Sequence, residues 1–141
     1  MASLLEDMKA RAAARAKRTI RLPNPEDQGQ VFVCRVPTDG MELDRLHKAA
    51  AREKQGAETH LARAVVAACV ESIEDGGRVL EVDGLVVNFR DPELQNALQV
   101  ANAKEAVVAL IGSDGIIAAM AKHLIEEAGY ADGMFSDPTE G

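Results

Sequence analysis

The sequence predicts a mixed α+β domain, predominantly helical, with about five helices, one N-terminal strand and a short β-hairpin. Hydrophobic residues make up 47% of the 141 residues but aromatic residues only 3%, so the core must be aliphatic, which favours closely packed helices. The stretch QVFVCRV, residues 30–36, alternates and is rich in β-formers, which predicts a strand. Asp83-Gly84 lies between two β-rich runs and is a strong hairpin signal near residues 79–89.

The first segment, SLLEDMKARAAARAKRTI at residues 3–20, predicts a helix. Ser3 and Glu6 have the spacing of a capping box, and the segment is rich in alanine. Its apolar stripe, which we expect to be separate from a face lined by arginines, is thin and consists of Leu4 or Leu5, Met8, Ala12 and Ala16. Because so narrow a stripe makes a poor core contact, we expect residues 1–22 to form a basic helical arm that lies loosely on the body or binds a partner.

Residues 23–130 are expected to form the mainly helical core domain, and residues 131–141 a flexible acidic tail. Two prolines and a glycine predict a turn within residues 21–30, and Pro37 ends the strand that follows. Capping residues and apolar periodicity then predict further helices. These span about residues 40–55 and 58–74, one or two short helices from Pro92 to Gly112, and a last helix from Ser113 to Gly129.

Charge is distributed unevenly along the chain. Residues 1–22 hold six basic and two acidic residues, a balance of +4. Because the net charge of the whole chain is −7, the remaining residues carry −11. A positive arm on a negative body suggests either a homo-oligomer or a polyanionic partner. Nucleic acid is not the favoured partner, because no aromatic residue is interleaved for base stacking and the acidic body would oppose approach.

The sequence predicts no catalytic residue, no metal site and no cofactor. Cys34 lies among apolar residues of the alternating strand and is expected to point into the core, where a thiol is unreactive. His47 is expected to be a partly buried packing residue. The three histidines are far apart in sequence and match neither HxxxH nor HExxH. Without a long apolar run or a signal peptide, we expect no membrane partner and a cytoplasmic location.

The order of these elements resembles that of a known family. A charged N-terminal helix precedes a strand ending in VFVCRVPT, a helix opening GMELDRLHKAA and an alanine- and valine-rich helix ARAVVAACVE. PELQNALQVANAKEAVVALIG and the acidic final helix IAAMAKHLIEEAG follow. Over residues 31–71 and 93–129 the chain resembles the tail assembly chaperones of long-tailed, siphovirus-type bacteriophages.

This resemblance implies a non-enzymatic protein that acts in the host cytoplasm during virion morphogenesis. Such chaperones bind the tape-measure protein, keep it soluble and promote assembly of the tail-tube protein around it; many are made in two lengths by ribosomal frameshifting. We expect the partner-binding surface at Leu4, Leu5 and Met8, or else at Ile116, Ile117 and Met120, although the latter three also fit a core role. Two alternatives remain, a structural head–tail connector or tail-completion protein and a small DNA-associated regulator.

Overall fold

The computed structural model describes residues 3–130, so the expected flexible tail at 131–141 lies outside the described residues. Helices account for 53% and strands for 18% of this part, which confirms a mixed α+β fold. The helices are α1 (Leu4–Ala16), α2 (Gly40–Ala51), α3 (Ala57–Cys69), α4 (Pro92–Leu98), α5 (Ala103–Ile111) and α6 (Asp114–Glu127). The strands are β1 (Thr19–Pro23), β2 (Gln30–Arg35), β3 (Val70–Asp75), β4 (Arg78–Val79), β5 (Glu81–Val82) and β6 (Leu85–Val86).

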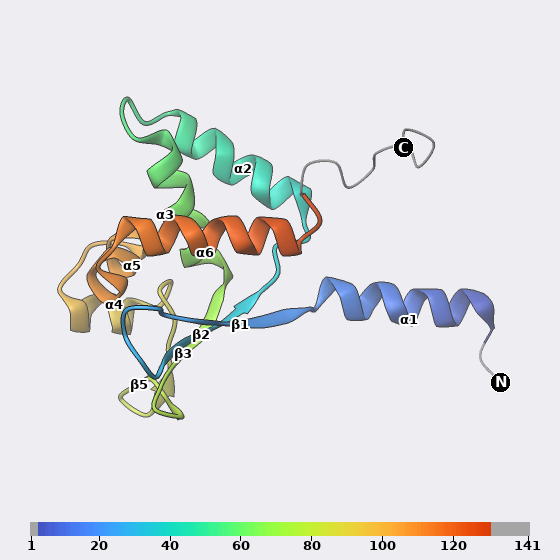
Figure 1. Ribbon diagram of the computed structural model, residues 1–141, viewed down its shortest axis with the longest axis horizontal. Helices are drawn as coiled ribbons and strands as arrows, with labels where there is room; N and C mark the ends of the chain where they lie inside the picture. The colour runs from blue at the N-terminus through green and yellow to red at the C-terminus, as the bar shows by residue number, and fades with distance from the viewer. Residues whose placement is uncertain (1–2, 131–141) are drawn as a thin grey trace.

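The fold has two layers, with helices α2 to α6 on one side of an antiparallel sheet (Figure 1). The sheet has the order β1-β2-β3-β4, and β5 and β6 form a separate two-stranded hairpin. Helix α3 packs against α2, α5 and α6 and is therefore the centre of the helical layer. Helix α1 extends away from both layers (Figure 1).

Strand β2 contributes buried side chains from the sheet to the hydrophobic core. Phe32 and Cys34 are fully buried while Val31, Val33 and Arg35 alternate with them on the opposite face, as the sequence predicts. The rings of Phe32 and Phe89 lie 6.3 Å apart between centroids, in a tilted arrangement. This pair supplies two of the three phenylalanines to the core.

The prediction that the first helix continues to Ile20 is wrong, because the helix ends at Ala16 and residues 19–23 form β1. Thr19 to Leu22 alternate polar and apolar side chains, a period of two that suits a strand. Pairing places Ile20 opposite Cys34 and Leu22 opposite Phe32, so both apolar residues face the core. The end of the predicted arm is therefore an edge strand of the sheet.

The prediction of one helix over residues 58–74 is also wrong, because α3 ends at Cys69 and β3 begins at Val70 without a turn between them. Val70 and Ile73 are three residues apart and both buried, a spacing typical of a helix. A bulge explains it: Val70 pairs with Cys34, and Ser72 with Val33, so Glu71 is the extra residue. The bulge brings Val70 and Ile73 to the same face of a strand.

The remaining elements follow the prediction more closely. Asp83 and Gly84 have φ values of 52° and 80° and join β5 to β6, which confirms the hairpin. Residues 92–112 form two short helices, α4 and α5, and Ser113 caps α6 through a hydrogen bond from the Ile116 N–H. The described residues therefore contain six helices, one more than expected, and a larger sheet.

The α5–α6 connection offers a matched pair of glycines for measuring backbone strain. Gly112 has φ of +81°, whereas Gly115 lies within α6, where an added Cβ would be 3.5 Å from Ser113 Oγ, an ordinary van der Waals distance. We expect Gly112→Ala to lower the free energy of unfolding by about 1–2 kcal/mol, because the left-handed conformation penalises a Cβ. Gly115→Ala should raise it by up to about 1 kcal/mol through helix propensity. Urea denaturation monitored by circular dichroism measures both, and equal effects would contradict this description.

Candidate functional site

Helix α1 displays the first predicted binding set to solvent. Leu4, Leu5 and Met8 are 72%, 66% and 50% exposed, and none of the residues of α1 is buried. The capping box between Ser3 and Glu6 is present, as predicted. Arg11 and Arg15 lie next to Met8 rather than on a separate face, because residues three and four apart are neighbours on a helix. The exposed surface of α1 thus combines an apolar end with a basic end.

Arg18 fixes the base of α1 to the body. Its guanidinium pairs with the Glu127 carboxylate, and its Nη1 donates to the Glu127 carbonyl oxygen at 3.3 Å. The Arg18 carbonyl oxygen accepts from the Val36 N–H at 2.9 Å. The cationic side chain therefore lies at the C-terminal end of α6, where the helix dipole favours positive charge. These contacts join the start of β1 to β2 and to α6.

The second predicted binding set lies largely in the core. Ile117 is 0% exposed, and Ile116 and Met120 are 8% and 6% exposed, all within the main hydrophobic cluster. Ile117 therefore has no surface to offer a partner in this conformation. Ile116 and Met120, however, form part of the floor of a surface groove.

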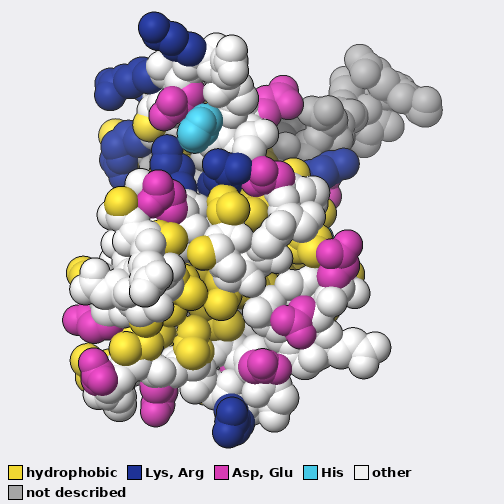
Figure 2. All heavy atoms as spheres, turned by 90° about the vertical axis from the view of Figure 1, so that its left-hand side faces the viewer, with side chains coloured by type: hydrophobic (Ala, Val, Ile, Leu, Met, Phe, Trp, Pro, Cys, Tyr) yellow, Lys and Arg dark blue, Asp and Glu magenta, His cyan; other side chains and the backbone are white. Residues whose placement is uncertain are grey.

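This groove, called the α6 groove below, runs between the start of α6 and the end of β1. Its volume is about 420 Å³. Its lining is Leu22, Pro23, Pro25, Glu26, Ser113, Gly115, Ile116, Ala119 and Met120. Figure 2 shows the left-hand face of Figure 1, where hydrophobic side chains reach the surface with both acidic and basic side chains around them. Most of the groove lining is apolar, with one carboxylate from Glu26.

Sequence reasoning identified Ile116 and Met120 but missed the groove itself. Its two walls come from residues 22–26 and 113–120, about ninety positions apart, and meet only because β1 joins the sheet beneath α6. The one local signal is Ala119, an exposed small residue between the buried Ile116 and Met120.

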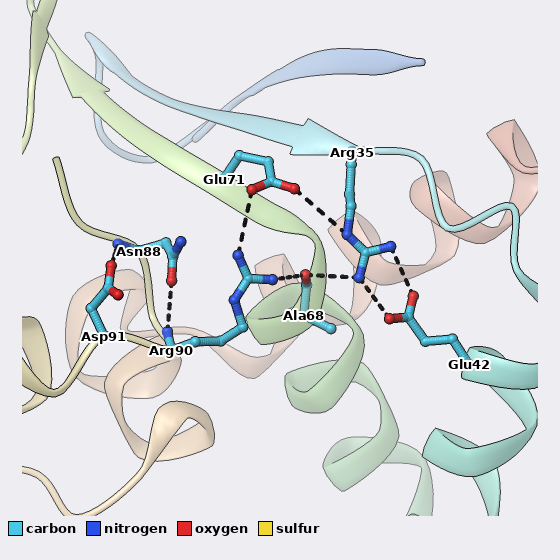
Figure 3. A network of polar contacts seen from close by, with 7 residues as sticks. All are labelled: Arg35, Glu42, Ala68, Glu71, Asn88, Arg90 and Asp91. Carbon is cyan, nitrogen blue, oxygen red and sulfur yellow. Dashed lines mark hydrogen bonds and ion pairs between the residues drawn. The ribbon is translucent and has the colours of Figure 1, made fainter. Parts of the chain in front are cut away.

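A network of charged side chains lies where α3 passes directly into β3 (Figure 3). Arg35 forms two hydrogen bonds with Glu42, at 2.8 and 2.7 Å, and donates to the Ala68 carbonyl oxygen at 3.1 Å. Arg90 donates to the same oxygen, and both arginines approach Glu71, at 3.6 and 3.4 Å. The network joins β2, α2, α3 and the segment after β6, so we interpret it as structural.

Both cysteines are buried near charged groups of this network. Cys34 and Cys69 are 0% exposed, which confirms that Cys34 points into the core. Burial raises the pKa of the Cys34 thiol to about 12 and that of Cys69 to about 11. A thiol that stays protonated and buried is a poor nucleophile.

The histidines occupy different environments. His47 is exposed, so the prediction of a partly buried packing residue is wrong. His60 lies with Glu53, Arg63 and Lys104 in a pocket of about 480 Å³, and its buried Nδ1 has no hydrogen-bond partner among the described residues. The pocket mixes cations and anions, and Arg63 is already paired with Asp114 at 2.8 Å. Within residues 3–130 no group of three His, Cys, Asp or Glu residues is placed to hold a metal ion.

Thiol labelling tests the buried cysteines. At pH 8 we expect native protein to react with a thiol reagent far more slowly than protein in guanidinium, which should expose two thiols. Above the ordinary thiol pKa of about 9 the unfolded state gains stability by ionising while the folded thiols stay neutral. Stability should therefore fall as pH rises from 9 towards the folded values of 11 to 12. Rapid native labelling at pH 8 would contradict this placement.

Substitution of the two arginines tests the network. Arg35→Met removes its hydrogen bonds to Glu42 and Ala68, so we expect about 1.5–3 kcal/mol lower free energy of unfolding. In the double variant with Arg90→Met, the free energy of unfolding should fall by more than the sum of the two single losses. No arginine then donates to the Ala68 carbonyl oxygen. Exposed Arg45→Met on α2 is the control and should stay within about 0.5 kcal/mol. Additive losses in urea denaturation would contradict a shared acceptor.

Comparison of the chain with family models, with curated proteins and with solved structures found no match. Within residues 3–130, no single helix has both the length and the apolar composition needed to cross a membrane. Helices α5 and α6 meet those criteria only together, and they are bent by 115° at their connection.

Proposed function

We propose that this protein is a tail assembly chaperone of a long-tailed bacteriophage. In this role it binds the tape-measure protein in the host cytoplasm, keeps it soluble and promotes assembly of the tail-tube protein around it. The family resemblance over residues 31–71 and 93–129 supports the proposal from the sequence. The observation that carries it in the structure is the exposed apolar end of α1, at Leu4, Leu5 and Met8.

The chemistry of this surface suits binding of an apolar helix. Leucine and methionine side chains contribute buried area, and the unbranched methionine adapts to partners of different shape. An amphipathic helix recognises another helix through apolar side chains three and four positions apart, as Leu4, Leu5 and Met8 are. The net charge of −7 would help to keep a complex with a hydrophobic chain in solution.

A structural role in the virion is the second candidate. The pairing of Arg18 with Glu127 anchors the base of α1, and the helix points away from the body (Figure 1). A helix held in this way could insert between neighbouring subunits of a head–tail connector or a tail-completion complex. Detection of the protein in purified virions would favour this candidate, whereas its absence from virions would favour the chaperone.

Co-expression with the tape-measure protein of the same phage tests the proposal. We expect the wild-type chain to increase the soluble fraction of the tape-measure protein, and the Leu5→Glu/Met8→Glu variant to lose most of that gain. The variant places two charges in the apolar surface, and its body should stay folded because none of the residues of α1 is buried.

The matched control is Ala10→Glu/Ala13→Glu, which adds the same charges at the same spacing on the opposite side of α1. This control should retain the wild-type effect. No gain in solubility with the wild-type chain would refute the chaperone proposal, and equal losses in the two variants would refute the assigned surface.

A further inference from the structure

We infer that α1 of one copy of this chain docks into the α6 groove of a second copy, and that the exchange is reciprocal and forms a dimer. The inference concerns the free protein and does not rest on the proposed function. It combines an unpartnered helix, a groove that this helix cannot reach within its own chain, and opposite charges on the two surfaces.

Helix α1 lacks the packing that normally stabilises a helix of its length. It has 13 residues, none of them buried. Isolated helices shorter than about 12–15 residues are marginal in water, and most helices in proteins depend on burying an apolar face. The capping box contributes only part of the stability required. A surface that covers Leu5 and Met8 would supply the rest.

The α6 groove of the same chain is out of reach of α1. Helix α1 leaves the body at the start of β1, whereas Leu22 and Pro23 of the groove lie at the end of that strand. Five strand residues span about 13 Å, and α1, about 20 Å long, extends in the opposite direction (Figure 1). Only Lys17 and Arg18 separate α1 from β1, and Arg18 is held by Glu127 and by the Val36 N–H, so little chain is free to reverse direction. A second copy meets no such obstacle.

The groove has the shape and chemistry to receive α1. Its floor contains Ile116 and Met120, and the small residues Gly115 and Ala119 leave room for a helix to approach α6 closely. Pro23 and Pro25 form the opposite wall. The groove volume of about 420 Å³ has space for more than one aliphatic side chain, as the pair Leu5 and Met8 requires.

Charge favours the same partner. Arg11 and Arg15 lie beside Met8 on α1. Glu26 lies in the groove wall and is the charged residue of the groove lining. Residues 1–22 carry +4 and the rest of the chain −11, so the arm of one copy is attracted to the body of another. In a reciprocal exchange, α1 of each copy occupies the α6 groove of the other, and the assembly closes as a twofold dimer.

Sedimentation of the purified full-length chain tests the inference without any partner. We expect a concentration-dependent dimer whose dissociation constant rises with salt, because charge contributes to docking. Met8→Glu should raise that constant by roughly a hundred- to ten-thousandfold, because each of the two docking contacts of the dimer loses one large buried apolar side chain. Ala119→Arg in the groove should have a similar effect.

Two controls match these variants in charge. Ala10→Glu lies on the opposite side of α1, and Ala118→Arg lies on α6 next to Ala119 and is exposed but outside the groove. Both should dimerise like the wild type. Circular dichroism of every variant should confirm that the body remains folded, and any unfolded variant is replaced by Leu5→Glu or Gly115→Gln at the same surface.

A mixture of variants distinguishes this dimer from other modes of association. The Met8→Glu chain retains an intact groove and the Ala119→Arg chain an intact α1, so mixing them should produce a heterodimer through one docking contact. Association through α1 alone would be insensitive to Ala119→Arg, and either that result or a monomeric wild type at high concentration would overturn the inference. A monomeric wild type that still solubilises the tape-measure protein would overturn the exchange and leave the proposed function standing.

Discussion

The carbonyl oxygen of Ala68 is the point on which the two layers of this fold depend. Helix α3 runs into β3 with no intervening turn, so its last carbonyls need donors from elsewhere. Arg35 from the sheet and Arg90 from the segment after β6 both donate to this oxygen. Glu42 and Glu71 then balance the two guanidinium groups. Since α3 is the helix that contacts α2, α5 and α6, this junction sets the position of the whole helical layer over the sheet.

Local signals predicted most elements, and long-range pairing explains the errors. The alternation of residues 30–36, the Asp83-Gly84 turn and the Ser113 cap each act within a few residues, and the corresponding elements are present. Strand β1 was missed although residues 19–22 alternate, because the alternation is short and directly follows an alanine-rich helix. Strand β3 was missed because the bulge at Glu71 gives it a helical spacing of apolar residues, and only its pairing with β2 decides in favour of a strand.

The candidate binding residues can also be divided into those that local signals predict and those that depend on long-range contacts. Leu4, Leu5 and Met8 were recognisable because a narrow stripe on an alanine-rich helix has no evident core role, and all three are exposed. Ile116, Ile117 and Met120 are also apolar but bury their side chains against the body. The α6 groove depends on β1 lying beneath α6, so no pattern within either segment indicates it. Surface chemistry was therefore predictable for an isolated helix and not for a surface built from distant segments.

The proposed binding role and the inferred docking of α1 between two copies both make α1 the interacting element of this protein. Hydrogen exchange of its backbone amides tests that claim most directly. The experiment compares dilute protein, concentrated protein and protein with the tape-measure protein added. We expect amides of residues 4–16 to exchange rapidly in dilute solution, because the helix has no buried residue, and to become protected under either of the other conditions. Protection of α1 that stays the same in all three conditions would contradict its role as the binding element.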